Sequence, residues 1–183
     1  MRFDELYTER LILRIITPEV LDYAYNYLSD WQVMELMGFS SEAVLQREKE
    51  KYNKGLTTFN KSFLYFILTD RADQKVIGWC GYHTWYIDHN RAELGYGLYY
   101  DDYKQHGLMS EALKEILVYG FRVMALHRIE AFTATNNTAS IKTLQKFGFR
   151  QEATLREHYL VNGKMEDSLL FSLLKIEFNH GKN

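Results

Sequence analysis

A glycine-bearing turn between a predicted strand and a predicted helix offers a binding site for an anion. The turn lies in residues 103–113, whose single glycine is Gly107. It follows a strand rich in glycine and tyrosine, residues 93–100, and leads into a long amphipathic segment. The first N–H groups of a helix have no carbonyl partner, and the helix dipole makes that end positive. Such a turn is suited to a phosphate group, although taken alone it is equally an ordinary helix entry.

A second polar block lies further along the chain. Residues 136–140 read Asn-Asn-Thr-Ala-Ser, and residues 146–149 read Lys-Phe-Gly-Phe. Asn137 is a good N-cap and Ser140 falls in the first turn of the predicted helix, where both residue types are favoured for local reasons. Together with the Gly107 turn, this block points to a cofactor that carries a pyrophosphate, and we expect coenzyme A.

The elements that precede the turn follow from apolar patterns and turn residues. Residues 11–16 are β-branched enough for a first strand. Thr17 as N-cap and Pro18 at the first helical position start a helix that runs to about Tyr27. A second helix opens at residues 40–42 and continues through the charged stretch to residue 54. Three strands then follow as a meander, at residues 63–68, 75–86 and 91–100.

The elements after the turn complete the predicted fold. Apolar residues between Met109 and Met124 recur at intervals of three and four, which predicts a helix. A strand over 128–135, a helix over 139–147 capped by Gly148, and a hairpin around Asn162-Gly163 follow. The order β-α-α-β-β-β-α-β-α-β-β describes an α+β fold with a mixed, mostly antiparallel sheet and helices on both faces. Since no linker interrupts the sequence, we expect one domain over residues 1–183.

Composition narrows the classes of function. The formal charge of −2 and the sequence pI near 6.3 argue against a nucleic-acid partner, which requires a basic face. Cys80 is the only cysteine, so a disulfide within the chain and a cysteine-based zinc site are excluded. Its apolar surroundings favour a buried, inert thiol over a nucleophile. The histidines show no ligand spacing, so no metal is expected. Without a signal segment or a membrane-spanning apolar run, we expect a cytoplasmic protein with no membrane partner.

Five blocks occur in an order that is specific to one superfamily. They are residues 8–14, residues 92–96, Gly107 with residues 111–113, Asn137-x-x-Ser140, and residues 146–149 with Asp167 in the final hairpin. In these blocks the chain resembles the GNAT superfamily of N-acetyltransferases, in particular its RimJ/RimL-type branch of ribosomal-protein N-terminal acetyltransferases. The resemblance implies the GNAT fold, acetyl-CoA as co-substrate and an amine as acceptor.

The acyl-CoA loop of that family has the form Arg/Gln-x-x-Gly-x-Gly/Ala. The resemblance places the binding of the cofactor's pyrophosphate on Lys104, Gln105, His106, Gly107, Leu108, Met109 and Ser110. Gly107 lets the backbone approach a phosphate closely, and Lys104 keeps a positive charge. Two residues depart from the pattern. Gln105 stands where the branch often has a further glycine, and Met109 replaces a small residue and could narrow the phosphate seat.

Roles along the pantetheine arm also come from the resemblance. It implies that pantetheine lies beside the strand over residues 96–99 and pairs with backbone groups of Leu98 and Tyr99. An ordinary core strand would explain the same apolar residues, and the sequence leaves both open. Asn137 would hydrogen-bond the arm, and the Ser140 hydroxyl would face the sulfur and stabilise the departing thiolate. A tyrosine is the alternative donor, but 14 tyrosines give no unique choice.

Glu93 is the candidate for the catalytic base. An N-terminal amine has a pKa near 8 and a lysine amine a pKa of about 10.4, so the attacking nitrogen must lose a proton near neutral pH. Glu93 begins the strand that leads to the thioester, where the related branch commonly has an acidic residue; the alternative is a solvent-exposed carboxylate. Four aromatic residues are candidates for lining the acceptor cleft, or equally for the core: Trp31, Phe39, Trp85 and Tyr86.

We therefore expect an acetyl-CoA-dependent N-acetyltransferase that acts by direct attack in a ternary complex. The acceptor is a primary amine, either a protein or peptide N-terminus or a small molecule, and its identity stays open. The alternative is a non-catalytic acyl-CoA-binding sensor or interaction module, which the departures at Gln105 and Met109 keep open. A nucleotide-binding domain is disfavoured because the chain has no Gly-Lys-Ser/Thr motif. The sequence also leaves a homodimer open.

Overall fold

The computed structural model describes residues 3–55, 57 and 61–180, and within them eight strands form one sheet. The order of the strands is β1-β2-β3-β4-β5-β6-β8-β7, and every pair of neighbours except β5 and β6 is antiparallel. The strands are β1 (Glu5–Tyr7), β2 (Leu11–Ile16), β3 (Lys61–Asp70), β4 (Val76–Tyr86), β5 (Arg91–Leu98), β6 (Arg128–Ala134), β7 (Arg150–Val161) and β8 (Lys164–Leu174).

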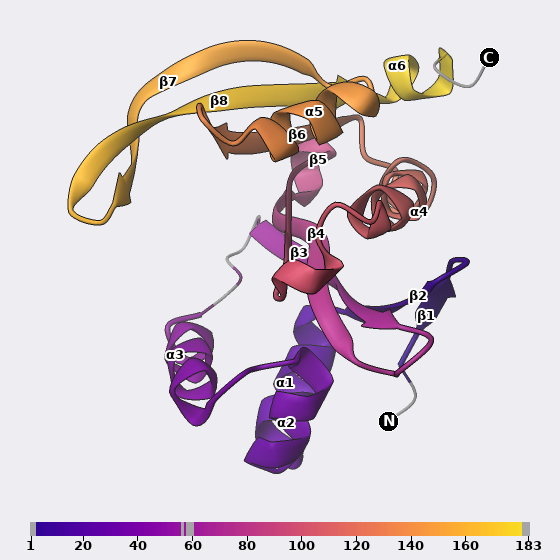
Figure 1. Ribbon diagram of the computed structural model, residues 1–183, viewed down its shortest axis with the longest axis vertical. Coiled ribbons are helices and arrows are strands. Elements are labelled where there is room, and N and C mark those ends of the chain that lie inside the picture. The colour runs from indigo at the N-terminus through magenta and orange to yellow at the C-terminus, as the bar shows by residue number, and fades with distance from the viewer. Residues whose placement is uncertain (1–2, 56, 58–60, 181–183) are drawn as a thin grey trace.

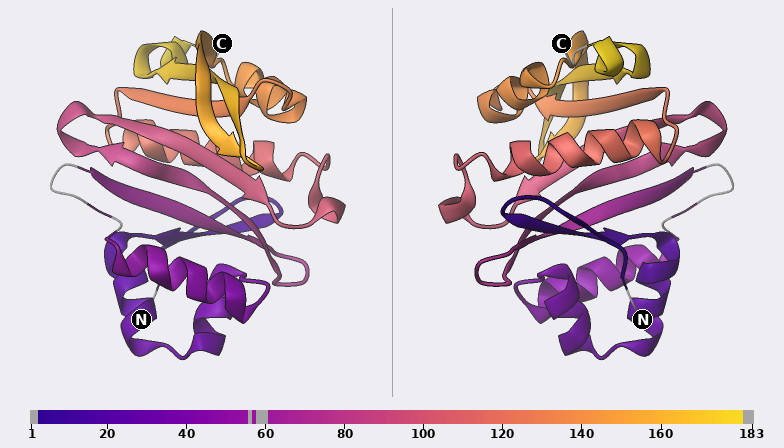
Figure 2. Two further views of the ribbon diagram at one scale, coloured as in Figure 1. Left: turned by 90° about the vertical axis from the view of Figure 1, so that its left-hand side faces the viewer. Right: turned by 90° about the vertical axis from the view of Figure 1, so that its right-hand side faces the viewer.

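Helices cover both faces of this sheet. They are α1 (Pro18–Tyr27), α2 (Asp30–Met37), α3 (Glu42–Asn53), α4 (Leu108–Arg122), α5 (Thr138–Lys146) and α6 (Lys175–His180). One apolar core lies between the strands and α4 and α5, and a second lies between the strands and α1 to α3. Figure 1 shows α3 and α4 on opposite sides of the central strands, and Figure 2 shows α4 lying along the sheet. The predicted mixed, mostly antiparallel sheet with helices on both faces is confirmed.

The structure adds elements that the sequence analysis missed. Helix α2 starts with a capping box, in which Ser29 and Gln32 bond each other's backbone, and ends at Gly38 in the left-handed conformation. Eight residues give too few turns for a clear apolar period, so this Ser-x-x-Gln spacing was the available signal. The three-residue strand β1 and the six-residue helix α6 are too short to show any period. By contrast, Thr17 caps α1 and Pro18 begins it, as predicted.

The parallel pair β5–β6 separates soon after it begins. Its ladder joins residues 91–93 of β5 only to residues 128–130 of β6. Beyond Glu93, β5 stays paired with β4 as far as Leu98, while β6 pairs with β8 over its whole length. Among the described residues, therefore, the edge of β5 that faces away from β4 has no strand partner after Glu93. This separation of β5 from β6, the splay, holds both predicted catalytic residues, Glu93 and Ser140.

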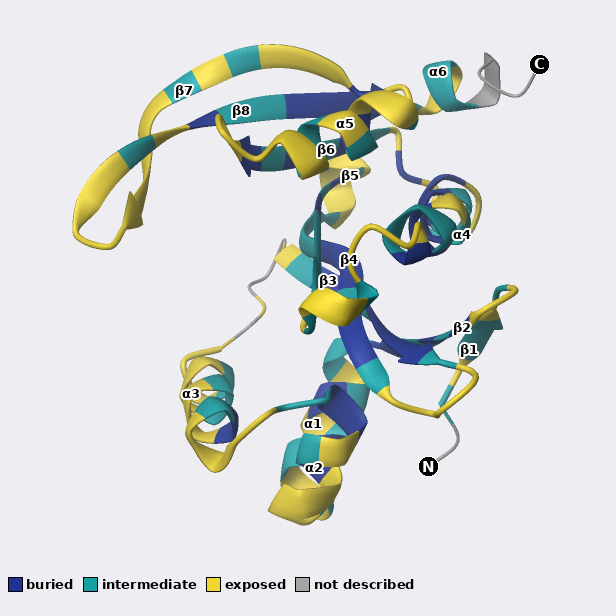
Figure 3. Cartoon of the chain, viewed as in Figure 1, coloured by how far each residue is buried: buried dark blue, intermediate teal, exposed yellow. Residues whose placement is uncertain are grey.

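The terminal hairpin projects from the rest of the molecule. Asn162 and Gly163 have φ of 50° and 80°, as a two-residue hairpin turn with two left-handed positions requires, so the Asn-Gly prediction is confirmed. Strand β7 lies at the edge of the sheet, and Figure 3 shows that it is largely exposed along its length. An irregularity in the pairing between Leu155 and Tyr159 brings Tyr159 to the splay.

Candidate active site

A cavity of about 370 Å³ lies in the splay. Its polar and aromatic lining comes from Trp79 and His83 of β4, Glu93 and Tyr96 of β5, Asn137 and Ser140 at the start of α5, and Tyr159 of β7. Side chains alternate between the faces of a strand, so Glu93 and Tyr96 project from opposite faces of β5. Tyr96 packs against the core that contains α4 and α5, whereas Trp79 packs against the core under α1 to α3. The splay cavity is thus lined from both faces of the sheet.

Glu93 and His83 form a pair on the face of the sheet covered by α1 to α3. The Oε1 atom of Glu93 lies 3.3 Å from Nε2 of His83, and both side chains are largely buried. Thr84 also hydrogen-bonds the Glu93 carboxylate, and its Oγ1 lies 3.2 Å from His83 Nδ1. The sequence analysis chose Glu93 but missed His83, because nothing in its neighbourhood shows that β4 turns it toward Glu93.

Burial changes the proton affinity of both members of this pair. Loss of solvent raises the pKa of Glu93 above its ordinary 4.5, and the nearby Glu130 carboxylate raises it further, against hydrogen bonding by Thr84 and the charge of His158. Burial also lowers the pKa of His83 below 6.5. At neutral pH His83 is therefore an uncharged imidazole, so its 3.3 Å contact with Glu93 is a contact between a neutral ring and a carboxyl group rather than an ion pair.

Tyr96 and Ser140 form a second pair on the opposite face. Their hydroxyl oxygens lie 2.8 Å apart, and either can donate to the other. Burial is the main cause that raises the pKa of Tyr96 above 10, so the phenol keeps its proton at neutral pH. The sequence left a choice between Ser140 and an unidentified tyrosine as the group near the sulfur. The structure shows Tyr96 bonded to Ser140, so the two candidates form one unit.

Asn137 caps α5 with its side chain. Its Oδ1 accepts from the backbone N–H of Ser140 at 3.1 Å. The local explanation for Asn137 is therefore realised in the structure. The residue also lines the splay cavity, which leaves its amide nitrogen as the group suited to a ligand carbonyl.

Every second residue of β5 directs its backbone N–H and C=O groups toward the splay. The N–H of Tyr99 donates to the carbonyl of Ile77 at 2.8 Å, so it is committed to β4. Of the backbone groups expected to pair with pantetheine, the Tyr99 N–H is therefore already bonded within the sheet. In an antiparallel pair, successive residues point their backbone groups to opposite sides, which turns those of Leu98 and Tyr96 toward the splay. Leu98 and Tyr96, rather than Tyr99, therefore have backbone groups directed toward the splay.

The glycine turn at the start of α4 has the shape that an anion site needs. Gly107 has a φ of 77°, and an added Cβ would have its nearest neighbour at 3.8 Å, so the turn is open. The N–H groups of Leu108, Met109 and Ser110 fall in the first turn of α4, where a helix offers them no carbonyl. Gln105 has a φ of 64°, a left-handed conformation that glycine adopts at lower cost, which explains why related loops place glycine there.

The side chains around this turn are arranged differently from what the sequence suggested. Met109 is half-buried and packs against the core, so it does not narrow the turn. The Lys104 ammonium is bound to Asp101 at 2.6 Å. His106 is exposed and its carbonyl accepts from Nη1 of Arg10. Arg10, held in place by Glu111 at 2.7 Å, thus brings a positive charge to the turn, a role that the sequence analysis did not assign.

Two further findings limit what this site holds. Among the described residues, no group of three or more His, Cys, Asp or Glu side chains is placed to bind a metal ion. Cys80 is fully buried, and burial raises the pKa of its thiol, as expected for an inert residue.

Within the described residues, no helix is long and apolar enough to cross a membrane.

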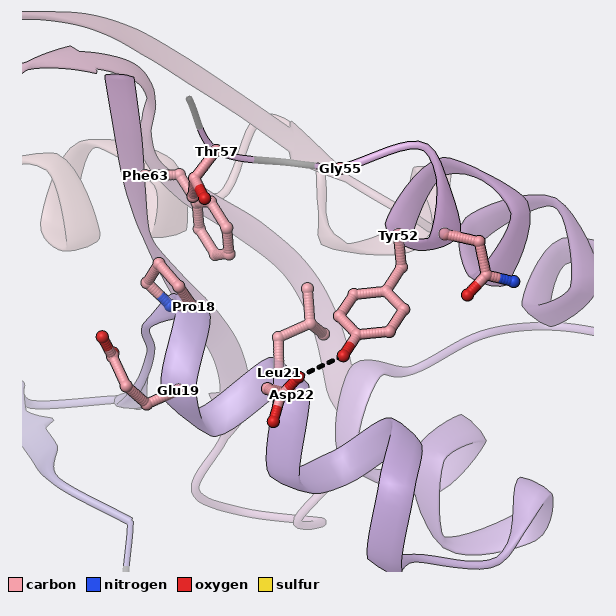
Figure 4. A pocket seen from close by; sticks show the side chains of 9 residues that line it. Pro18, Glu19, Leu21, Asp22, Tyr52, Gly55, Thr57 and Phe63 are labelled. Carbon is pink, nitrogen blue, oxygen red and sulfur yellow. Dashed lines mark hydrogen bonds between the residues drawn. The ribbon is translucent and has the colours of Figure 1, made fainter. Parts of the chain in front are cut away.

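Another hollow, of about 630 Å³, lies between the start of α1 and the end of α3. Figure 4 shows the Tyr52 hydroxyl of α3 pointing at the Asp22 carboxylate of α1, to which it is hydrogen-bonded. The described residues that line this hollow include none of the predicted site residues. The chemistry predicted from the sequence is therefore gathered in the splay and at the Gly107 turn.

Comparison with known proteins agrees with this geometry. A family model described as an acetyltransferase (GNAT) domain matches residues 10–150. An uncharacterized N-acetyltransferase, p20 of Bacillus licheniformis, is 34% identical over 177 residues, which cover 96% of this chain and 98% of that protein. The ribosomal protein uS5-alanine N-acetyltransferase of Escherichia coli is 27% identical, with 97% of this chain and 94% of that protein covered.

Solved structures share the fold. The ribosomal-protein-S5-alanine acetyltransferase of Vibrio fischeri has a TM-score of 0.66 at 22% identity and covers 96% of this chain and 98% of its own. Mutant forms of the spermidine/spermine N-acetyltransferase SpeG of Vibrio cholerae have a TM-score of 0.70 at 20% identity, with 95% and 99% covered. GNAT acetyltransferases use acetyl-CoA as co-substrate. The chain belongs to the GNAT family of acetyltransferases, and it is an N-acetyltransferase with relatives among the ribosomal-protein acetyltransferases.

Proposed function

We propose that this protein transfers the acetyl group of acetyl-CoA to a primary amine by direct attack in the splay cavity. The observation that carries the proposal is the pairing of groups across that cavity. A carboxylate and a neutral imidazole, Glu93 and His83, line one end, while two hydroxyl groups, Tyr96 and Ser140, line the other. Titratable groups whose environments suit opposite proton transfers are the usual mark of an acid–base pair.

The chain has groups that fit each part of acetyl-CoA. The open Gly107 turn and the first N–H groups of α4 suit the pyrophosphate, with Arg10 adding positive charge. The unpaired edge of β5 at Tyr96 and Leu98 suits the amides of pantetheine, with Asn137 opposite. Bound there, acetyl-CoA supplies an activated acyl carbon. Leu108 and Met109 of the α4 turn pack against the same core as Tyr96, which supports a cofactor whose phosphates and sulfur lie on one face of the sheet.

Glu93 takes the proton that the amine must lose. The ammonium nitrogen needs a free lone pair before it attacks the thioester carbon, and the Glu93 carboxylate accepts its proton directly or through water. Neutral His83 lies 3.3 Å from the Glu93 carboxylate, and Thr84 hydrogen-bonds that carboxylate, so these two side chains position it. The raised pKa of Glu93 makes it a stronger base than an exposed carboxylate.

Tyr96 and Ser140 serve the leaving group. When the carbon–sulfur bond breaks, the electron pair stays on sulfur, and the hydroxyl pair hydrogen-bonds the thiolate and supplies a proton. The Ser140 hydroxyl alone is a weak acid, but its bond to the Tyr96 phenol provides a donor with a lower pKa. The nitrogen loses its second proton as the tetrahedral intermediate collapses, and this proton replaces the one that the hydroxyl pair gave to sulfur. The products are an amide and the thiol form of coenzyme A, with one proton left on Glu93.

The acceptor of this reaction is not fixed by the relatives. Some of them are named for ribosomal proteins and some structural neighbours for spermidine, and these names describe those proteins. The comparisons give no support to the alternative of a non-catalytic acyl-CoA sensor, because the matching relatives are named N-acetyltransferases. We therefore treat the enzyme as active on a primary amine.

A two-part experiment tests the proposal. Acetyl-CoA should raise the melting temperature of the protein, and an amine panel should release free thiol from acetyl-CoA at a rate that depends on amine concentration. Acetyl-CoA without amine is the control for hydrolysis. A stabilised protein that releases no thiol with any amine would favour the sensor, and a protein without a thermal shift at millimolar acetyl-CoA would refute the cofactor.

A further inference from the structure

A second cavity, the aromatic cavity, lies beside the splay on the face covered by α1 to α3. Its volume is about 590 Å³, within the range of small-molecule sites. Six aromatic side chains from five parts of the chain line it: Tyr25, Phe39, Tyr65, Trp79, Tyr99 and Tyr100. Of the four aromatic residues expected from the sequence at an acceptor cleft, Phe39 lies here. Trp31 is 69% exposed on α2, and Trp85 packs against the other core.

The aromatic cavity carries little net charge. Its two charged side chains, Glu48 and Lys51 of α3, are bound to each other at 2.6 Å. Burial is the main cause that raises the pKa of Tyr25, Tyr65 and Tyr99 to about 12, with the Glu48 carboxylate adding to the effect. The three phenols are therefore uncharged at neutral pH. A polycation would find one carboxylate here, and that one is already paired.

Trp79 is the wall that the two cavities share. It lines both of them, and its ring lies over the two glycines of β5. A Cβ at Gly95 would stand 2.8 Å from the Trp79 ring and from the His83 ring. The aromatic cavity therefore adjoins the end of the splay cavity that holds Glu93 and His83, where the amine must lose its proton.

We propose that the aromatic cavity binds the body of the acceptor, and that the preferred acceptor is a primary amine carried by an aromatic ring on a short linker. This inference rests on the proposed function, because the amine has to reach Glu93. An aromatic body packs its faces and edges against the six rings and leaves no charge to be compensated. The same chemistry is found in a free arylalkylamine and in a peptide that begins with phenylalanine.

Val44 offers a way to fill the cavity without touching the acid–base groups. It lines the aromatic cavity from α3, whereas Gln46 on the same helix is exposed and lies outside it. Val44→Phe adds a ring inside the cavity, and Gln46→Phe adds the same ring to the surface. Glu48→Gln removes the carboxylate and keeps the volume, so it separates charge from shape.

The experiment measures kcat/KM of wild type and the three variants with 2-phenylethylamine, n-propylamine and spermidine. Wild type should prefer 2-phenylethylamine over the other two by about tenfold or more. Val44→Phe should remove that preference while n-propylamine turnover stays within about twofold of wild type; Gln46→Phe and Glu48→Gln should keep it. Equal turnover of all three amines by wild type, a preference for spermidine lost in Glu48→Gln, or an unaffected Val44→Phe would overturn the proposal.

Two further experiments complete the test. One separates this inference from the proposed function, and the other shows whether a small amine or a peptide N-terminus carries the aromatic ring. Calorimetry of 2-phenylethylamine binding to wild type and Val44→Phe needs no turnover, so it tests the cavity even if no acetyl group is transferred. Binding to wild type that Val44→Phe weakens supports the inference, and no binding to wild type contradicts it. Dipeptide amides that begin with phenylalanine or glycine then show whether a peptide N-terminus supplies the ring; a preference for glycine would also contradict the proposal.

Discussion

The two cavities that share Trp79 differ in both their chemistry and their origin. The splay cavity is lined by two pairs of polar groups: Glu93 in contact with His83, and Tyr96 hydrogen-bonded to Ser140. The aromatic cavity has one ion pair at α3 and is otherwise lined mainly by rings and aliphatic side chains. The groups of the splay cavity are suited to proton transfer, whereas those of the aromatic cavity are suited to selecting an acceptor by its shape. This difference underlies our proposal that the reaction takes place in one cavity and the acceptor is selected in the other, so that a substitution can disturb one function at a time.

The largest effect on kcat/KM is expected from a substitution of Glu93 in the splay cavity. Glu93→Gln keeps the shape but cannot accept a proton, so kcat/KM should fall about a hundredfold or more for every amine. In wild type the rate should fall with acidity as pH drops through the raised pKa of Glu93, because the protonated carboxyl is no base. The variant should lack that acidic limb, with the amine's own ionisation left as the remaining pH dependence. A pH–rate profile of kcat/KM checks both statements, and an unchanged acidic limb would remove Glu93 from the mechanism.

The next effect concerns the opposite end of the same cavity. Tyr96→Phe removes the hydroxyl that meets Ser140 and keeps the ring, so kcat should fall about thirtyfold with a small change in the KM for the amine. Ser140→Ala should act in the same direction. Because the two hydroxyls form one unit, the double variant should lose less than the product of the two single losses. Steady-state kinetics of the three variants measures this coupling, and independent losses would show that the pair does not act together.

A substitution at the shared wall tests whether the cavities are joined. The Cβ of Gly95→Ala would lie 2.8 Å from both Trp79 and His83, so one of these rings must move. We expect kcat/KM to fall about tenfold for both small and aromatic amines. Gly97→Ala is the matched control, since its Cβ would meet Trp79 at an ordinary 3.6 Å. Equal behaviour of the two variants would mean that Trp79 does not connect the cavities.

The smallest effect is expected from a substitution outside both cavities, Glu152→Gln, which should alter stability and leave activity unchanged. Arg128 of β6 binds Glu152 of β7, and this contact lowers the pKa of Glu152 from 4.5 to about 2. Because the folded state has the lower pKa, the stabilisation is complete above about pH 4.5 and is lost as pH falls toward 2. The Glu152 side chain is 40% exposed, so solvent screens the pair. Glu152→Gln should lower the free energy of unfolding by about 1 kcal/mol at pH 7.

Thermal or denaturant unfolding at several pH values checks this prediction. The difference between wild type and Glu152→Gln should shrink as pH falls through the window from about 4.5 to 2. Turnover at pH 7 should be unchanged. A difference in stability that grows toward acid would contradict the sign of the linkage.

The sequence predicted the splay cavity far better than the aromatic one, for a physical reason. Gly107, Asn137 and the Asn162-Gly163 turn depend on local backbone conformation, which neighbouring residues largely determine. Glu93 and Ser140 could be found from their places beside such features. His83, Arg10 and Tyr96 acquire their roles through contacts with distant strands and helices, so no local pattern marked them.

The aromatic cavity is assembled from α1, the loop after α2, α3, β3, β4 and the end of β5. Nothing in a single segment shows that Tyr25, Tyr65 and Tyr99 meet. Nor did the sequence show that the N–H of Tyr99 points toward β4, because the direction of a backbone group depends on the β4–β5 register. The expectation of one domain over residues 1–183 stays a prediction, as do the individual roles of the site residues.

A crystal structure with acetyl-CoA bound is the most direct test of the central claim, that the splay joins a base and a hydroxyl pair around one thioester. We predict the pyrophosphate at the Gly107 turn and pantetheine along β5 at Leu98 and Tyr96. The sulfur should lie within about 4 Å of the Tyr96 or Ser140 hydroxyl, with the acyl carbon turned toward Glu93. A sulfur that points away from both hydroxyls, or phosphates bound elsewhere, would contradict the account.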